Sequence, residues 1–305
     1  MSPRPSLLAV VVAGLGCAAT GAAPSPASQG PSDGEAPEAA VGTDAGPAAP
    51  DVAEVASARD AATGSDAGTR TCGALALCDD FEGRPVGGSP DPARWMVGAP
   101  DLTGTGALAI DDAQHHSGAR SVKVTGQGGY SNHIFFSNRT VIGTLGPVVW
   151  ARFYVRLSDA LGDGHVTFLA MADAGAGGKH VRMGGQSKIL MWNRESDDAT
   201  LPALSPAGIA ASEPLPTGQW LCVELMIDQG SGGMPASMRT WVDGAEIAGL
   251  HLDATPTPDI DEQWLRQAWH PMLTDFALGW ESYAGQAMTL WLDDVALDAH
   301  RVGCQ

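Results

Sequence analysis

The chain has 305 residues with 17 basic and 35 acidic side chains, which gives a formal net charge of -18. A charge this negative argues against nucleic-acid binding, because phosphate recognition needs a basic surface. All nine tryptophans lie between Trp95 and Trp291, so we expect one folded domain, preceded by a segment of a different kind.

Residues 1–17 are predicted to form a signal peptide. Arg4 supplies the positive charge, and residues 7–15 supply an apolar run that is too short to span a membrane. Gly14-Leu-Gly-Cys17 resembles a bacterial lipobox, although glycine stands where leucine is usual. Lipidation of Cys17 and ordinary cleavage a few residues later are the two alternatives. Both predict an exported protein, either lipid-anchored at the cell envelope or secreted.

Residues 18–71 are predicted to be a disordered linker. They are rich in Ala, Pro, Gly, Ser and Asp and contain no aromatic residue, so they cannot bury enough apolar surface to offset the entropy of ordering. Residues 72–305 form the predicted domain, with four cysteines at Cys72, Cys78, Cys222 and Cys304. In an exported domain these predict two disulfides with three alternative pairings.

The domain is predicted to be all-β, a two-sheet antiparallel sandwich or jelly roll of the concanavalin-like kind. Short alternating or β-rich runs separated by Gly, Pro, Asp and Ser clusters indicate this class. The expected strands are 121–125, 148–157, 165–172, 180–192, 220–227, 237–242, 275–280 and 288–297. One short helix is expected at 261–269, capped by Asp259 or Asp261.

The expected strand 180–192 carries the most informative pattern. Side chains along a strand alternate between its two faces. The even positions to 194 are therefore expected to share one polar face: His180, Arg182, Gly184, Gln186, Lys188, Leu190, Trp192 and Arg194. A rigid row of this kind suits a polar, anionic ligand.

Two further strands have a polar and aromatic second face. The first sets Arg152, Tyr154 and Arg156 opposite Phe153 and Val155, and the second sets Glu281 and Tyr283 opposite Leu278 and Trp280. Aromatic planes stack on sugar rings, and planar donors bind hydroxyls or carboxylates. This composition predicts saccharide recognition.

Five motifs occur in the order seen in one known family. They are Cys78-Asp-Asp-Phe-Glu-Gly83, His116-Ser-Gly-Ala-Arg-Ser-Val-Lys-Val124, His180-x-Arg182-x-x-x-Gln186, Trp220-Leu-Cys-Val-Glu224 and Trp291-Leu-Asp-Asp-Val-Ala-Leu297. From Cys72 to Cys304 the chain resembles the cellulose-induced protein core-domain family. That family is similar to glucuronan and alginate lyases with a β-jelly-roll fold.

The resemblance implies a structural calcium ion between the first and last strands. By motif, Glu82 and Asp293 would supply carboxylates, and oxygens near Ser117 and Arg120 would complete the shell. Hard oxygen ligands suit Ca²⁺. The alternative is that the carboxylates here are only solvated strand ends.

The resemblance also implies β-elimination from an acidic polysaccharide, with a carboxylate neutraliser, a base and an acid. Arg182 and Gln186 would neutralise the uronate. His180, with His165 as a second candidate, would be the base. The candidate acids are Tyr154 and Tyr283, and the predicted substrate-binding residues are Lys188, Trp192, Arg194 and Arg152.

Other functions remain open from the sequence alone. One alternative is that Arg182 only pairs with Glu224 or Glu281, and the chain has three tyrosines and no Tyr-Phe-Lys-x-Gly-x-Tyr strand of the alginate-lyase kind. A non-catalytic carbohydrate-binding surface module is therefore the alternative function. A glycosidase using Glu224, Glu281 or Asp243 and a purely structural envelope protein rank lower. We expect a monomer that binds acidic polysaccharide and meets a membrane only through a lipid anchor.

Overall fold

The computed structural model describes residues 72–98 and 105–304, so the predicted signal peptide, Cys17 and the linker lie outside the described residues. Strands dominate the described chain. They are β1 (Leu77–Asp79), β2 (Met96–Val97), β3 (Ala107–Asp111), β4 (Ser121–Gly126), β5 (Asn132–Asn138), β6 (Val148–Leu157), β7 (Val166–Asp173), β8 (Lys179–Gln186), β9 (Ile189–Arg194), β10 (Ala199–Leu201), β11 (Trp220–Asp228), β12 (Ser237–Val242), β13 (Ala245–Glu246), β14 (Phe276–Ser282) and β15 (Met288–Asp298).

Helices are short and lie in connections. In the described residues the α-helices are α1 (Pro206–Ala210) and α2 (Glu262–Leu265), and the 3₁₀ turns are η1 (Cys72–Ala74), η2 (Ile142–Thr144), η3 (Ala174–Ala176) and η4 (Ala248–Leu250). Ser205 caps α1 by accepting a hydrogen bond from the Gly208 amide. No helix in the described residues is long and apolar enough to cross a membrane.

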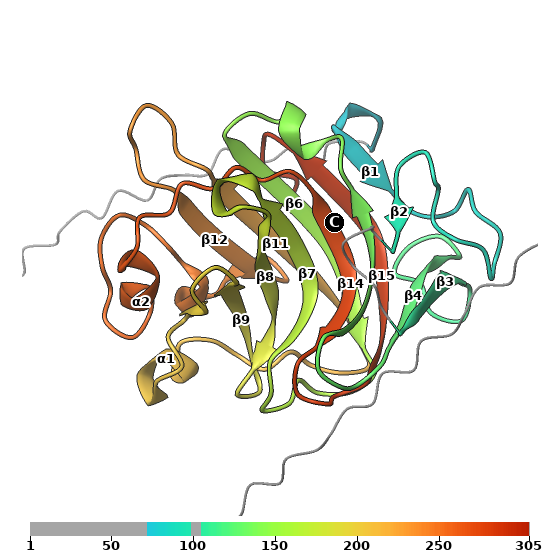
Figure 1. Cartoon of the computed structure of the whole chain (residues 1–305). Helices are drawn as coiled ribbons and strands as arrows, with labels where there is room; N and C mark the ends of the chain where they lie inside the picture. Colours follow the sequence, from blue (N-terminus) through green and yellow to red (C-terminus); the bar gives the residue numbers. More distant parts are fainter. Residues whose placement is uncertain (1–71, 99–104, 305) are drawn as a thin grey trace, which may run out of the picture. The chain divides into compact units, whose positions relative to one another are not determined.

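The strands form two antiparallel sheets. Sheet A has the order β13-β12-β11-β6-β15-β4-β3, with β1 also paired to β15, and sheet B has the order β10-β9-β8-β7-β14-β5-β2. The two sheets lie one on the other, with β7, β8, β9 and β14 in one layer and β6, β11, β12 and β15 in the other (Figure 1). The predicted all-β sandwich is confirmed.

The core fills the space between the sheets. Alternate residues of both sheets point inward, such as Phe153 and Val155 of β6 and Val181 and Met183 of β8, all of which are buried. Burial of such side chains is the main force that holds the two layers together. The other face of each sheet, which we call its outer face, points away from this core.

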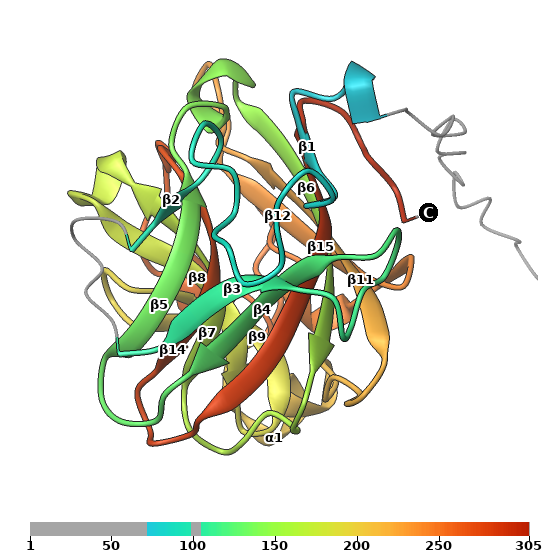
Figure 2. The same ribbon diagram turned by 90° about the vertical axis from the view of Figure 1, so that its right-hand side faces the viewer.

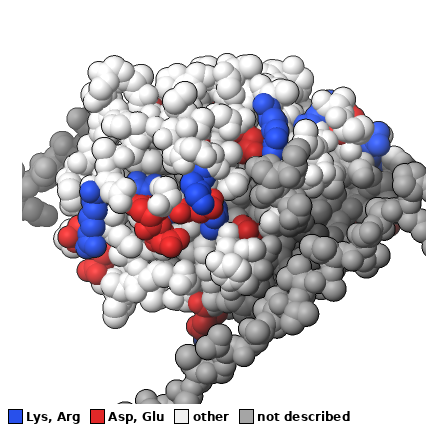
Figure 3. All heavy atoms as spheres, in the orientation of Figure 1, with Lys and Arg blue, Asp and Glu red and all other residues white. Residues whose placement is uncertain are grey.

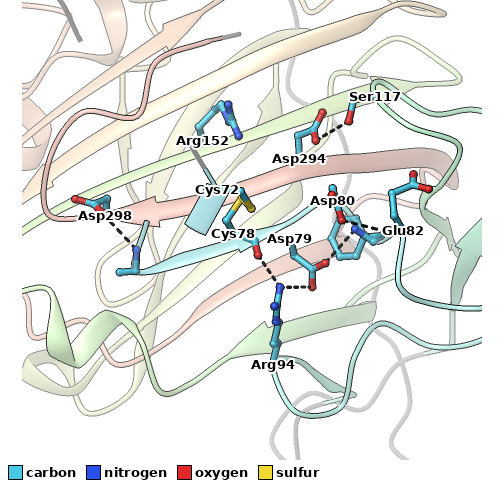
Figure 4. Close-up of a disulfide and its surroundings, with 12 residues drawn as sticks. Cys72, Cys78, Asp79, Asp80, Glu82, Arg94, Ser117, Arg152, Asp294 and Asp298 are labelled. Atoms are coloured by element: carbon cyan, nitrogen blue, oxygen red, sulfur yellow. Dashed lines mark hydrogen bonds and ion pairs between the residues drawn. A yellow bond between two sulfur atoms is a disulfide. The ribbon is translucent and has the colours of Figure 1, made fainter. Parts of the chain in front are cut away.

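Two disulfides select one of the three predicted pairings. Cys72 pairs with Cys78, and Cys222 pairs with Cys304. Figure 4 shows the first of these joining η1 to β1, where Arg94 donates to the Cys78 carbonyl at 2.6 Å. The second joins β11 to the C-terminal segment.

The region expected as one strand, 180–192, is two strands. Ser187 and Lys188 have φ values of 53° and 68° and form a tight two-residue turn between β8 and β9. Positive φ at both central residues belongs to the type I′ turn, which matches the twist of paired strands. The expected helix 261–269 is likewise shorter, because α2 spans only Glu262–Leu265, and Asp261 makes no side-chain cap.

Candidate functional site

The outer face of sheet B collects polar side chains from five adjacent strands. Opposed residues in an antiparallel ladder share a face. The register pairs Arg182 with Ala170, Arg182 with Asn193, Thr167 with Gly184, Thr167 with Glu281, and Glu281 with His133. We call this surface the polar face. Figure 3 shows basic and acidic atoms intermixed over β8 and β9.

The polar face contains irregular pairing at its centre. The register shifts between Thr167 and Leu169 on β7, and between Leu278 and Glu281 on β14. Bulges of this kind re-aim side chains and are common beside active sites. Here one lies on β7, beside the strand that carries Arg182, and the other lies on β14, which itself carries Glu281.

Arg182 is the anchor of the polar face. It is only 6% exposed, and its guanidinium donates to Glu195 at 2.8 Å. Burial alone would raise the pKa of Glu195, but hydrogen bonds from His180 and the charge of Arg182 hold that pKa far below its usual range. Glu195 therefore stays ionised and fixes Arg182. The pairing with Glu224 or Glu281 that we considered from sequence is wrong.

Tyr283 and His165 lie beside this guanidinium. The Arg182 carbon Cζ is 5.0 Å from the Tyr283 ring centroid, and the His165 ring stacks on the same phenol at 5.0 Å. Burial, together with the positive charge of Arg182, lowers the pKa of His165 to about 4. Burial, together with the charge of Glu281, raises the pKa of Tyr283 above its usual value. Near neutral pH, His165 is therefore neutral and Tyr283 is protonated, which are the forms that a general base and a general acid require.

Glu281 connects Tyr283 to a residue that the sequence analysis missed. Its carboxylate is hydrogen-bonded to the Tyr283 phenol and lies 3.5 Å from His133 Nδ1. His133 and Glu281 are each 8% exposed. The signal for His133 was the alternation of Asn132-His-Ile-Phe-Phe-Ser-Asn138, a strand that we did not predict.

Several buried polar atoms on this face have no hydrogen-bond partner among the described residues. They are Nε2 of His133, Nε2 of His180, Oγ1 of Thr167, Oδ1 of Asn193 and Oγ of Ser137, and Nδ1 of His133 has only its 3.5 Å contact with Glu281. Buried polar groups are normally paired, so a concentration of such atoms calls for an explanation such as a bound ligand or water.

His180 and Gln186 lie at opposite ends of β8. His180 Nδ1 is 3.0 Å from Glu195, and the His180 amide also donates to Glu195 at 2.8 Å. His180, the first candidate base, thus contacts Glu195 through its ring and its amide, at the end of β8 that lies away from His165. Gln186 is half-buried. It follows Gly185, which pairs with Val166, so it lies at the end of β8 that is near His165.

Three predicted substrate-binding residues do not lie on the polar face. Lys188 is in the exposed turn near Asp163, at 3.6 Å. Because the two-residue turn reverses the alternation, Trp192 pairs with Met183 and is fully buried in the core, where its indole nitrogen donates to Thr240. Arg194 also points to the core side, with a two-hydrogen-bond pair to Asp197 at 2.8 and 2.7 Å.

Tyr154 and Arg152 also lie elsewhere. Both are on β6, in sheet A, with their side chains on the outer face of that sheet. His116 stacks on Tyr154 at 3.4 Å, and Arg152 lies 5.6 Å from the same ring. The prediction that Tyr154 shares a site with Arg182 is therefore wrong, which leaves Tyr283 as the candidate acid.

The acids considered for hydrolysis are also separated. Glu224 is fully buried on the outer side of sheet A, where it accepts from Arg301 at 2.8 Å, whereas Glu281 is on sheet B. A glycosidase needs two carboxyl groups that flank one bond. Glu224 and Glu281 cannot form that pair.

The residues predicted to hold calcium surround one loop. Glu82 Oε1 accepts from the amides of Ala119 and Arg120 at 2.7 and 2.8 Å, and Asp293 Oδ2 accepts from those of His116 and Ser117 at 2.8 and 3.3 Å. Figure 4 shows Glu82 and, on the last strand, Asp294, which accepts a hydrogen bond from the Ser117 hydroxyl. The donor chemistry suits Ca²⁺. However, the described side chains include no group of three or more His, Cys, Asp or Glu placed to hold a metal.

Comparisons with known proteins agree with this architecture. A family model described as the Cip1-like core domain, of polysaccharide lyase-like type, matches residues 84–300. The solved structure of the cellulose induced protein Cip1 is 41% identical with a TM-score of 0.67, and the match covers 75% of this chain and 100% of that chain. No curated protein matches the chain.

Two more distant structures match with low TM-scores. An endo-β-1,4-glucuronan lyase from the fungus Trichoderma reesei has a TM-score of 0.40 and 16% identity, with coverage of 65% of this chain and 88% of that chain. The CBM22-1 xylan-binding domain of Paenibacillus barcinonensis Xyn10C has a TM-score of 0.36 and 12% identity, with coverage of 73% and 93%.

Proposed function

This chain belongs to the Cip1-like core-domain family of polysaccharide lyase-like proteins, and from that premise we propose that it cleaves a uronic-acid-containing polysaccharide by β-elimination on the polar face. One observation carries the proposal. Arg182 and His165 lie on the same phenol ring, that of Tyr283, each 5.0 Å from it. The group that would neutralise the carboxylate, the neutral base and the protonated acid are thus close enough together to act on one sugar residue.

The chemical steps follow from these three groups. The guanidinium of Arg182, with the Gln186 amide, binds the uronate carboxylate and makes the adjacent C–H more acidic. His165 takes that proton, a carbon–carbon double bond forms, and the glycosidic C–O bond breaks. Tyr283 gives its proton to the leaving oxygen. The stacked His165 then returns a proton to the phenolate, which restores both groups for the next turnover.

Glu195 and Glu281 act as positioning residues in this proposal. Glu195 holds Arg182 at 2.8 Å, and Glu281 accepts the Tyr283 hydrogen bond. Preorganised groups need no rearrangement when charge develops in the transition state. The polar atoms left without partners on this face, such as Thr167 Oγ1 and Asn193 Oδ1, would bind sugar hydroxyls.

The test is the ultraviolet absorbance of the unsaturated uronate product. Purified protein is incubated with glucuronan, alginate and pectate, with calcium present, and the absorbance is followed over time. A rise on one polymer supports elimination. No rise on any of them, with binding to the polymer still measurable, would favour a non-catalytic carbohydrate-binding module instead.

The activity is expected to persist in acid until the pH approaches 4. His165 must be neutral to accept a proton, and its pKa is lowered from 6.5 to about 4 by burial and by Arg182. The measurement is log(kcat/KM) against pH. An acid limb with its midpoint at the value of an unperturbed imidazole would contradict the assignment of His165 as base.

Stability must be followed in the same pH series. Because the folded pKa of His165 is depressed, the unfolded chain binds its proton first as pH falls, so the free energy of unfolding decreases between 6.5 and about 4. Circular dichroism at each pH restricts the rate data to the range in which the domain is folded.

We also propose a calcium ion held by Glu82 and Asp293, with oxygens of the loop at Ser117 and Arg120 as further ligands. Calcium would tie this loop to both strand ends and stabilise the folded state by mass action. Addition of Ca²⁺ to chelator-treated protein is expected to raise the melting temperature, and Asp293→Asn is expected to remove most of that rise. An unchanged melting temperature in the chelated wild-type protein would count against the ion.

We further propose that the protein works outside the cytoplasm, as a monomer, secreted or lipid-anchored through Cys17. The support is the apolar N-terminal run and the two disulfides, which persist in oxidising compartments. Radiolabelled fatty acid incorporation that is lost in Cys17→Ala would identify the anchored form.

A further inference from the structure

A row of aromatic and basic side chains crosses the outer face of sheet A. The register pairs Trp220 with Arg156, Arg156 with Trp291, and Trp291 with Lys123. Opposed residues share a face, so the row runs across β11, β6, β15 and β4. All four side chains are half-buried. We call these four residues the tryptophan row.

The row faces away from the core. Its neighbours along each strand, such as Leu221, Val155 and Leu292, are buried between the sheets, and strand side chains alternate between faces. The polar face with Arg182 belongs to sheet B. The two surfaces therefore lie on opposite sides of the sandwich, and a ligand on one does not occupy the other.

We propose that the tryptophan row is a second binding site, for an extended acidic polysaccharide strand. Trp220 and Trp291 are separated by two strand spacings, roughly 9.5 Å. That distance is close to a disaccharide repeat in an extended β-1,4-linked polymer, so alternate sugar rings would meet the two indoles. Indole faces are strong stacking surfaces for sugar rings.

The indole of Trp291 is held in a fixed position. Its ring nitrogen donates to Asp111 at 2.9 Å, and Lys123 Nζ lies 5.7 Å from its ring centroid. Trp220 contacts the His116 ring edge-on at 6.1 Å. Rigid aromatic groups lose little conformational entropy on binding and are typical energetic centres of recognition.

Two cations along the row favour an anionic ligand, and the carboxylate beside them, that of Asp111, accepts the hydrogen bond from the Trp291 indole. Arg156 lies between the two tryptophans and donates to the Gly218 carbonyl, and Lys123 lies on the far side of Trp291. Within residues 72–98 and 105–304, the contacts found for these cations are a backbone carbonyl for Arg156 and the Trp291 ring for Lys123, and no ion pair with a carboxylate is found for either. On a chain with net charge -18, two such cations beside indoles would neutralise uronate groups.

The row opens into a hollow at the edge of the sheet. This hollow has a volume of about 190 Å³ and is lined by Ala107–Asp111, Lys123 and Thr125. Figure 2 shows β3, β4 and β15 side by side at this edge. Small alanine side chains at Ala107 and Ala109 leave room for the polymer to continue past Lys123.

The decisive experiment measures polymer affinity in variants of the two faces. The probes are soluble glucuronan, which is anionic, and hydroxyethylcellulose, which is neutral, in affinity electrophoresis and calorimetry with the full chain. The variant Trp220→Ala/Trp291→Ala is expected to bind glucuronan at least roughly tenfold more weakly, as loss of aromatic anchors does elsewhere. Cleavage of a short glucuronate oligomer is expected to stay unchanged.

Trp150→Ala is the matched control. Trp150 is also half-buried on the outer face of sheet A, but it lies off the row, stacked on Trp241 at 5.3 Å. Its replacement is expected to leave glucuronan affinity unchanged. Lys123→Gln/Arg156→Gln is expected to weaken binding to glucuronan while binding to hydroxyethylcellulose stays as in the wild type.

Three results would overturn the second site. The first is wild-type affinity in Trp220→Ala/Trp291→Ala, and the second is loss of all polymer binding in Arg182→Ala alone. The third is a different mass in sedimentation for Trp220→Ala/Trp291→Ala and for the wild type, which would mean that the row is a contact between copies of the chain. This experiment measures polymer binding, so it tests the second site independently of lyase activity. It gives the same answer even if the protein forms no unsaturated product.

Discussion

Replacement of Arg182 by lysine is expected to lower kcat/KM for uronate elimination by at least about a hundredfold, the usual loss when one preorganised charge-stabilising donor is removed. Lysine keeps the positive charge opposite Glu195, so the buried carboxylate is not left alone. It lacks the planar fork that binds a carboxylate through two hydrogen bonds. The loss is therefore expected mainly in kcat, measured from the unsaturated product.

Arg194→Lys is the control for that variant. Arg194 is 3% exposed, lies on the adjacent strand β9 and is paired with Asp197 at 2.7 Å, but it points to the core side of sheet B. The two replacements thus disturb similar buried ion pairs, and melting temperatures are expected to fall by similar amounts. Equal activity losses in both variants, or full activity in folded Arg182→Lys, would remove Arg182 from the reaction.

The sequence predicted which residues share a face along one strand. It did not predict the sheet to which each strand belongs. Alternation correctly separated Arg152 and Tyr154 from Phe153, and Glu281 and Tyr283 from Trp280. It carries no information about whether two strands are in the same layer. Tyr154 was therefore grouped with Arg182, although β6 and β8 are in different sheets.

The turn at Ser187 and Lys188 explains the other misplaced residues. It contains neither Asn-Gly nor Asp-Gly, the pairs that usually mark a type I′ turn, so the region was interpreted as one strand. A two-residue turn preserves the face of the closing pair, Gln186 and Ile189, and thereby reverses the odd–even pattern beyond it. Trp192 consequently belongs to the core.

The polar face also depends on residues that no local pattern could identify. Glu195 follows β9 and His133 lies on β5, and both meet the site only through the lateral order of the strands. The family motif did identify Arg182, and with it the strand on which the site is built. Partners that come from distant segments require the sheet order, which sequence spacing does not contain.

Removal of the Cys222–Cys304 disulfide is expected to be the larger of the two stability losses that cysteine replacement can cause. The bonded cysteines are 82 residues apart, against 6 for Cys72 and Cys78. In the chain-entropy account, a longer loop gives a larger stabilisation, about 4.5 kcal/mol for the long loop and about 2 kcal/mol for the short one. The free energy of unfolding is measured in urea for Cys222→Ala/Cys304→Ala and for Cys72→Ala/Cys78→Ala.

The C-terminal segment is also held by contacts other than the disulfide, and these determine whether the native state survives its removal. Glu224 is fully buried and accepts from Arg301 Nε at 2.8 Å and from the Gly303 amide at 2.6 Å. These contacts hold the segment against sheet A without the disulfide, so we expect Cys222→Ala/Cys304→Ala to remain folded with an unchanged native circular dichroism spectrum. The loss then arises in the unfolded chain, which gains freedom and exposes more surface, and the urea m-value is expected to rise. Equal losses in the two double variants would show instead that local contacts around each cysteine, and not loop length, determine the stabilisation.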